Sequence, residues 1–368
     1  MSAVPPGADV DLLYTDVEEA LRASVRSVLS RRLSAPQVAA LYDGAAADPA
    51  LWQTLSAEVG LAGLLVPEDL GGAGATAREA AVVLEELGAA VAPVPFLTSS
   101  VVAVTALLAA GARDLATEVA EGTIAALATP LPATTVAPTV TATADGRLSG
   151  EIRSVAGALD AGVLLVPAAA ADGLRLYAVP ADRVRITPVV SLDMSRPIAD
   201  LGLTDVEATL LAEGEAARAA VEQALEAGAA LLASEQVGIA QWCLDTTVEY
   251  LKVRKQFGRV VGGFQAVKHR LADVFVQVES ARAAARYAAA TLAEGDPDRS
   301  VAAALAQAYC SDVAVLAAEE AVQLHGGIGM TWEHPAHLYL KRAKADQIAY
   351  GTAAVHHARL AGLVDLPA

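Results

Sequence analysis

A short basic connection between two long helical patterns, residues 253–273, constrains this chain more than any other stretch. Apolar residues before it recur at intervals of three and four, which predicts a long amphipathic helix over Val237, Ala240, Leu244, Val248 and Leu251. We expect Gly258 to end that helix in the left-handed conformation and a second helix to begin near Phe264. An arginine at one helix end, glycines in the connection and free N–H groups at the next helix start would suit a pyrophosphate.

Composition restricts the possible functions. The 368 residues are enough for two or three domains, and 54% hydrophobic but only 4% aromatic content indicates helical cores of Ala, Val and Leu. A net charge of −17 argues against nucleic acid as a partner. The absence of a basic n-region and of a continuous apolar run predicts a cytoplasmic protein without membrane insertion. Cys243 and Cys310 are expected to be buried thiols.

Three stretches with different patterns predict an α+β multidomain fold. Helical periodicity over residues 1–121 predicts an N-terminal helical domain. Residues 122–213 combine β-branched residues with turn signals such as Asp145-Gly146, which predicts a small middle β domain. Residues 214–368 return to helical periodicity and predict a C-terminal four-helix bundle whose last helix is interrupted near Gly351.

Two motifs in the C-terminal part resemble the signature of the acyl-CoA dehydrogenase family. The first is Arg254-Lys255-Gln256-Phe257-Gly258 with Phe264-Gln265 and Leu271-Ala272-Asp273, and the second is Gln323-Leu324-His325-Gly326-Gly327-Ile328-Gly329. In that family the arginine and phenylalanine reach across a subunit interface to the FAD of a neighbouring protomer. The resemblance therefore implies an FAD-dependent oligomer with cofactor contacts at Arg254, Phe257, Gln265, Gln323, Leu324, His325, Gly326, Gly327 and Thr352.

The N-terminal part also resembles this family, through Trp52, the loop at residues 66–74 and Leu84-Glu85-Glu86-Leu87-Gly88. We expect Glu68, Glu85 and Glu86 to lie on a solvated face without a catalytic role. The middle part departs from the family pattern. Where relatives carry Thr-Glu-Pro, Gly-Ser-Asp and Trp-Ile-Thr/Ser segments that hold the flavin ring, this chain has Ala128-Thr129-Pro130-Leu131-Pro132 and Gly150-Glu151-Ile152-Arg153-Ser154.

The family's catalytic base is missing at both of its known positions. Relatives remove the α-proton of a thioester with a glutamate, usually in an Ile-Tyr-Glu-Gly-Thr segment, but this chain has Tyr350 there. A minority resembling isovaleryl-CoA dehydrogenase carries the glutamate on the long helix, where this chain has Gly228. A phenol, with a pKa of about 10, is a poor base at neutral pH. Glu235, about 10 Å along the same helical face, is a candidate substitute or a polar interface contact, and Asp346 is a weaker candidate.

The sequence leaves two possible roles for His325, and the other histidines do not predict a metal site. His325 either faces the phosphates of the flavin cofactor or packs at a helix end. His334, His337, His356 and His357 do not have metal-ligand spacing with carboxylates, so no metal is expected.

The losses are selective, because groups that serve a protomer's own flavin are absent while groups that reach a neighbour's flavin remain. Bacterial α2β2 heterotetrameric acyl-CoA dehydrogenases, including those acting on steroid side chains, show such a division. Our leading hypothesis is therefore a base-lacking subunit that works on acyl-CoA with a homologous partner and an electron-transfer acceptor. The alternatives are a self-sufficient homo-oligomeric dehydrogenase with a relocated base, and a non-catalytic acyl-CoA or flavin-binding scaffold.

Overall fold

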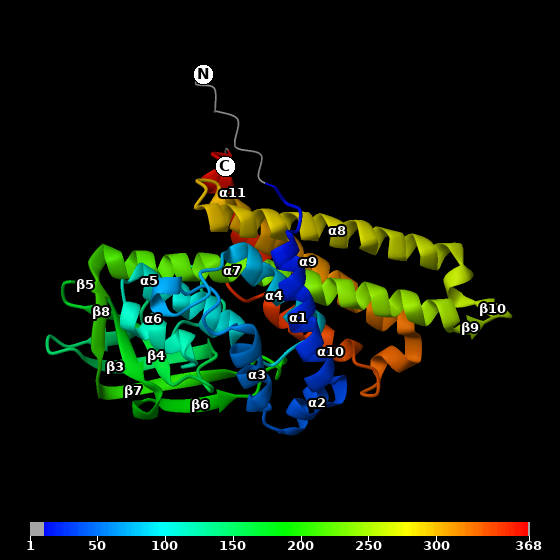
Figure 1. The fold of residues 1–368 in the computed structure, drawn as a ribbon. Helices are drawn as coiled ribbons and strands as arrows, with labels where there is room; N and C mark the ends of the chain where they lie inside the picture. The colour runs from blue at the N-terminus through cyan, green and yellow to red at the C-terminus, as the bar shows by residue number, and fades with distance from the viewer. Residues whose placement is uncertain (1–10, 367–368) are drawn as a thin grey trace, which may run out of the picture.

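The computed structural model describes residues 11–366 and divides into two helical parts with a sheet between them in the chain (Figure 1). The first part contains α1 (Asp16–Arg32), α2 (Ala35–Ala40), η1 (Leu41–Asp43), α3 (Pro49–Val59), η2 (Glu68–Leu70), α4 (Ala77–Ala89), the π-helical η3 (Phe96–Ala103), α5 (Val104–Ala109) and α6 (Arg113–Ala120). Two helices of this part, α1 and α4, begin at residues whose side chains cap the helix N-terminus. Thr15 and Glu18 form a capping box at α1, and Thr76 and Glu79 form another at α4.

Glu85 and Glu86, in α4, were expected to be solvated, and that expectation is wrong. They are only 3% and 6% exposed. Arg22 Nη1 lies 2.8 Å from Glu85 Oε2, and Arg26 Nη2 lies 2.7 Å from Glu86 Oε1. The two carboxylates therefore fasten α4 to α1, because an ionised group can be buried when a partner of opposite charge lies beside it.

The middle part is an eight-stranded sheet with the order β6-β7-β3-β2-β4-β5-β8, and β1 pairs in parallel with β4. The strands are β1 (Ala125–Leu127), β2 (Val140–Ala142), β3 (Arg147–Ala156), β4 (Val163–Ala170), β5 (Gly173–Pro180), β6 (Arg185–Val189), β7 (Ile198–Glu207) and β8 (Thr209–Glu213), with the 3₁₀ turn η4 (Ala181–Arg183). The hairpin predicted at Asp145-Gly146 joins β2 and β3, and Gly146 has the positive φ of 81° that its turn requires.

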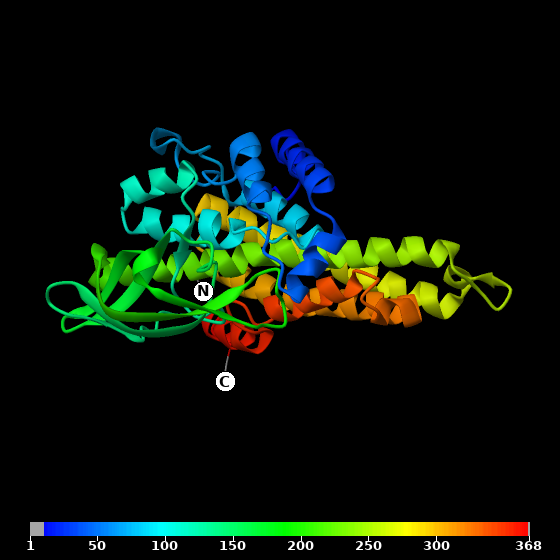
Figure 2. The same cartoon turned by 90° about the horizontal axis from the view of Figure 1, so that it is seen from below.

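The last part is a bundle of long helices (Figures 1 and 2). Its helices are α7 (Gly214–Val253), α8 (Gln265–Glu294), α9 (Arg299–His325), α10 (Ala336–Asp346) and α11 (Ala353–Leu363), with the 3₁₀ turns η5 (Val261–Gly263) and η6 (Gly326–Met330). The predicted interruption near Gly351 separates α10 from α11.

The segment of residues 299–330 is long and apolar enough to cross a membrane, but 72% of its most apolar window is buried inside the protein, as in a core helix. Cys243 and Cys310 are buried free thiols.

The expectation that Gly258 ends the first long helix is wrong. α7 ends at Val253, and a short hairpin of β9 (Lys255–Gln256) and β10 (Arg259–Val260) follows. Phe257 and Gly258 form its two-residue turn, with φ of 53° and 75°. Positive φ at both central residues is the geometry that joins two antiparallel strands in a tight hairpin. The hairpin lies at the end of the bundle remote from the sheet (Figure 1).

Candidate functional site

Tyr350, for which the sequence resemblance implies the position of a catalytic glutamate, is held firmly by the backbone around it. It follows α10 with a φ of 53°, a conformation uncommon for a residue with a side chain. Its N–H donates to Leu131 O (2.8 Å), and its carbonyl oxygen lies 2.8 Å from His356 Nε2. Its side chain is buried, and burial raises the pKa of the phenol to about 12. The phenol is therefore protonated at neutral pH and is not a base.

The same phenol packs against Gly228, the second position at which the resemblance implies a base. A Cβ added to Gly228 would lie 2.8 Å from Tyr350 Cε1, closer than real side-chain contacts come. Only glycine fits on α7 beneath this ring. One aromatic side chain thus occupies the space in which a carboxylate from either known position would act.

Little room remains beside Tyr350. The cavity there has a volume of about 10 Å³ and is lined by Thr98, Val102, Leu127, Thr129, Leu131, Ala156 and Tyr350. A cavity needs roughly 10–15 Å³ to hold a single water. Leu131 closes it from the sheet side, since Leu131 N–H donates to Ser154 O (2.9 Å) while Leu131 O accepts from Tyr350. The space beside Tyr350 therefore holds no more than about one water molecule.

Glu235, the candidate substitute base, lies in a buried network of ion pairs. It is 2% exposed, Oε1 lies 2.5 Å from Arg342 Nη1, and Oε2 lies 2.5 Å from Arg196 Nη2. Two guanidinium groups therefore engage both oxygens of this carboxylate. A base must be within reach of the proton it removes, and Glu235 could reach a substrate only by leaving these partners.

The network contains one more negative charge than positive charges. Arg196 and Arg342 face Asp193, Glu235 and Asp346, whose side chains come from α7, α10 and the segment before β7. Burial, with the neighbouring Glu235 and Asp193 charges, raises the pKa of Asp346 to about 7 despite Arg196. Asp346 Oδ2 has no hydrogen-bond partner among residues 11–366. Sequence reasoning named Glu235 and Asp346 but missed both arginines, which no motif marks.

The hairpin end of the bundle is strongly basic. Residues 252–270 contain six Lys or Arg and no Asp or Glu, although the whole chain has a net charge of −17. Arg254, Lys255 and Lys268 form no ion pair with any other residue that the structure describes. Phe257 is 90% exposed at the hairpin tip, and the Arg259 guanidinium lies 3.7 Å from the centroid of the Phe264 ring. This surface offers positive charge and aromatic faces to an anionic ligand.

The second motif lies beside this hairpin. The His325 ring stacks on Tyr250, near the end of α7, with centroids 4.5 Å apart. His325 Nδ1 lies 2.7 Å from Ala321 O, a carbonyl that only accepts, so Nδ1 carries the proton. Nε2 is buried without a partner in the described chain, and burial lowers the pKa of the imidazole. A Cβ at Gly326 or Gly327 would meet nothing within 4 Å, so a ligand can approach this backbone.

The predicted cofactor residues fall into two groups. Arg254, Phe257, Gln265 and residues 323–327 lie around the hairpin end, and a basic surface with accessible backbone fits the phosphates of FAD. Thr352 lies instead at the start of α11, two residues after Tyr350. Gly228, on α7, and Arg254, the first residue after α7, are 26 positions apart, which corresponds to about 39 Å along a helix. The hairpin end therefore offers groups that suit an anion, whereas the space beside Tyr350 is almost filled. No cluster of three or more His, Cys, Asp or Glu in the described residues suits a metal.

Comparisons with known proteins agree with this fold. The family model "Acyl-CoA dehydrogenase, N-terminal domain" matches residues 15–125, and "Acyl-CoA dehydrogenase, C-terminal domain" matches residues 207–362. Acyl-CoA dehydrogenase IpdE2 of Mycolicibacterium smegmatis is 38% identical over 331 residues, which cover 89% of this chain and 93% of that protein.

Two solved structures of paired enzymes are also similar. A variant of the Tcur3481-Tcur3483 steroid ACAD has a TM-score of 0.85 and 30% identity, covering 95% of this chain and 98% of that one. The ChsE4-ChsE5 complex from Mycobacterium tuberculosis has a TM-score of 0.86 and 27% identity, covering 97% of this chain and 100% of that one.

Proposed function

Since the chain belongs to the acyl-CoA dehydrogenase family, whose members are FAD-dependent flavoproteins, we propose that it is the base-lacking subunit of a hetero-oligomeric acyl-CoA dehydrogenase. In this proposal the chain completes the FAD site of a homologous partner in the cytoplasm, and the partner supplies the catalytic glutamate. The observation that carries the proposal is the packing of Tyr350 against Gly228, which leaves neither base position with a carboxylate. Glu235 has no catalytic role, because Arg196 and Arg342 hold its carboxylate.

The distance between the two halves of the site supports a role in trans. About 39 Å of helix separates Gly228 from Arg254, farther than one dinucleotide extends. A cofactor whose phosphates lay at this chain's hairpin would therefore have its flavin ring outside this chain's Tyr350 site. A neighbouring subunit provides the other half.

Each residue at the hairpin end has a definable task. The Arg254 guanidinium donates charge-assisted hydrogen bonds to a phosphate, and the accessible N–H groups near Gly326 and Gly327 donate to the same anion. Phe257 covers an apolar part of the cofactor and excludes water from it. When bound, FAD would supply the hydride acceptor for the β-hydrogen of the acyl group and the route for its electrons to an external acceptor.

We further propose a CoA thioester of a steroid-derived acid as the substrate of the complex. The support is the similarity to the Tcur3481-Tcur3483 steroid ACAD, at 30% identity over nearly the whole chain. Comparing kcat/KM for a steroid side-chain CoA thioester with that for butyryl-CoA tests this class. A preference for butyryl-CoA would refute it.

FAD content measured on the purified complex tests the role in trans. We expect the chain alone to hold little FAD and the complex with its homologous partner to retain it. Arg254→Ala should lower the FAD content of the complex, whereas Arg32→Ala, an exposed arginine on α1, should not. Full FAD content and acyl-CoA-dependent dye reduction by the chain alone, lost in Glu235→Gln, would identify a self-sufficient enzyme instead. Ligand binding without flavin reduction in any pairing would identify a scaffold.

A further inference from the structure

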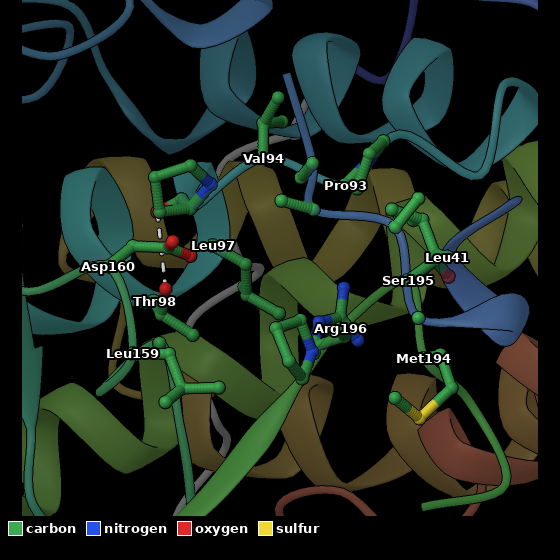
Figure 3. A pocket seen from close by; sticks show the side chains of 17 residues that line it. Leu41, Pro93, Val94, Leu97, Thr98, Leu159, Asp160, Met194, Ser195 and Arg196 are labelled. Atoms are coloured by element: carbon green, nitrogen blue, oxygen red, sulfur yellow. Dashed lines mark hydrogen bonds between the residues drawn. The ribbon is translucent and has the colours of Figure 1, made fainter. Parts of the chain in front are cut away.

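A cavity of about 300 Å³ lies where the N-terminal helices meet the sheet (Figure 3). Its walls come from residues 41–47, 93–98, 157–160 and 194–197. Thr98 is the one lining residue that it shares with the small cavity beside Tyr350. A Cβ at Gly157 would lie 2.5 Å from Thr98 Oγ1, so this glycine lets Thr98 pack against the sheet. The cavity is therefore separate from the filled site at Tyr350.

The size and lining of this cavity suit a small molecule. Pockets that bind small ligands are mostly apolar, with volumes from roughly 300 Å³ upward and a few polar groups that fix orientation. Apolar side chains such as Leu41, Val94, Leu97, Leu159 and Met194 form most of the wall. A ligand that fills this space would bury its hydrocarbon surface, which is the main source of affinity in such a site.

Asp160 is the polar group that lacks a partner at this wall. The Thr98 hydroxyl donates to Pro95 O (3.2 Å), as the dashed line in Figure 3 shows, and the Ser195 hydroxyl donates to Asp193 Oδ1 (2.5 Å). Arg196 is held by Glu235 and Asp346. Asp160, in contrast, makes no hydrogen bond or ion pair with another residue in the range 11–366. Asp160 is an exposed residue at the rim of the cavity, and partial desolvation by the surrounding wall raises the pKa of its carboxyl.

The charge around the cavity selects the kind of polar group that can enter. Behind Arg196, the network of three carboxylates and two guanidinium groups already has an excess negative charge. Asp160 adds another acidic group on the opposite wall. An incoming carboxylate or phosphate would lie near Asp160 and this excess negative charge, which is unfavourable. A hydrogen-bond donor, and above all a cation, would instead compensate Asp160.

We propose that this cavity binds a compact apolar molecule whose polar end is a hydrogen-bond donor, preferably a protonated amine, with that end on Asp160. Its hydrocarbon body lies against Leu97, Val94 and Leu159. This site is independent of the proposed FAD and acyl-CoA chemistry, because it shares only Thr98 with the cavity at Tyr350 and has no lining residue at the hairpin.

Three probes of one shape and different charge test the proposal on the purified full chain. They are cyclohexylmethylamine, cyclohexylmethanol and cyclohexanecarboxylate, and their dissociation constants are measured by ligand-observed NMR titration. We expect the amine to bind about tenfold more tightly than the carboxylate, which corresponds to about 1.4 kcal/mol, and the alcohol to lie between them. Asp160→Asn should remove the advantage of the amine over the alcohol.

A substitution that fills the cavity tests whether the probes bind there and not elsewhere on the surface. Ala46 lines the cavity and is exposed, so Ala46→Trp should block binding of the amine without harming the fold. Ala171→Trp, in the exposed β4–β5 turn, is the matched control and should bind normally. Equal or tighter binding of the carboxylate, unchanged amine binding in Ala46→Trp, or no saturable binding of any probe would overturn the proposal.

Discussion

Replacing Asp346 with asparagine should stabilise the protein, and more at alkaline than at acidic pH. Asp346 is fully buried at the end of α10, with one carboxylate oxygen 2.5 Å from Arg196 Nη1 and the other without a partner in the described structure. Asparagine has nearly the same shape and still offers an oxygen to Arg196. It removes the charge that leaves the buried network with three anions and two cations.

The pKa of this carboxyl sets the size and direction of the effect. Burial raises it to about 7 in the folded protein, whereas an unfolded aspartate has a pKa of about 4. Between these values the folded state holds a proton that the unfolded state has lost, so stability falls as pH rises through this window. Three pKa units correspond to about 4 kcal/mol, a cost present in full above pH 7 and nearly absent below pH 4. Asparagine does not titrate and avoids this cost.

Urea unfolding of both proteins at pH 5 and pH 8 measures the difference. From the two pKa values, the free energy of unfolding of Asp346→Asn relative to the original protein should rise by about 2 to 3 kcal/mol from pH 5 to pH 8. Asp273→Asn, on the exposed face of α8, controls for the loss of a surface carboxylate. An advantage that is constant or smaller at pH 8 would refute the reasoning that the network carries an uncompensated charge.

Three further substitutions test the packing and the exposed surface. Gly228→Ala should lower the free energy of unfolding by about 1 to 3 kcal/mol, because the new methyl group meets the Tyr350 ring, and adding Tyr350→Ala should cancel part of that loss in a double-mutant cycle. Glu85→Leu should cost roughly 3 kcal/mol in the same assay, since it leaves the largely buried guanidinium of Arg22 with only its longer contacts to Glu86 and Glu19; a change near zero would contradict the buried pair. Phe257→Ala should leave the stability of the isolated chain unchanged, because the ring is 90% exposed, but should lower the FAD content of the complex; equal FAD content would argue against the role of the hairpin.

The long helices, the β2–β3 hairpin and the break before α11 could be predicted from the sequence because their signals are local. Periodicity and turn residues act over a few positions, so they indicate the end part of α7, the start of α8 and the helical character of residues 214–368. Gly258 shows the limit of such a signal. A glycine with positive φ ends a helix or turns a hairpin equally well, and the pairing of residues 255–256 with 259–260 decided between them.

The candidate site could be predicted only in part, because its contacts are distant in sequence. The sequence shows directly that neither Tyr350 nor Gly228 is a carboxylate, yet the packing of the two residues joins positions 122 apart in the chain. The burial of Glu85 depends on Arg22 and Arg282, from two other helices. The pairing of Glu235 with Arg196 and Arg342 likewise depends on tertiary packing, which no periodic pattern encodes.

Anaerobic flavin bleaching by an acyl-CoA substrate tests the central claim most directly, on the complex and on the chain loaded with FAD alone. The complex should bleach, Glu235→Gln in this chain should bleach at the same rate, and replacing the partner's catalytic glutamate with glutamine should abolish the reaction. Bleaching by this chain without a partner, or its loss in Glu235→Gln within a complex of unchanged stability and FAD content, would contradict the account.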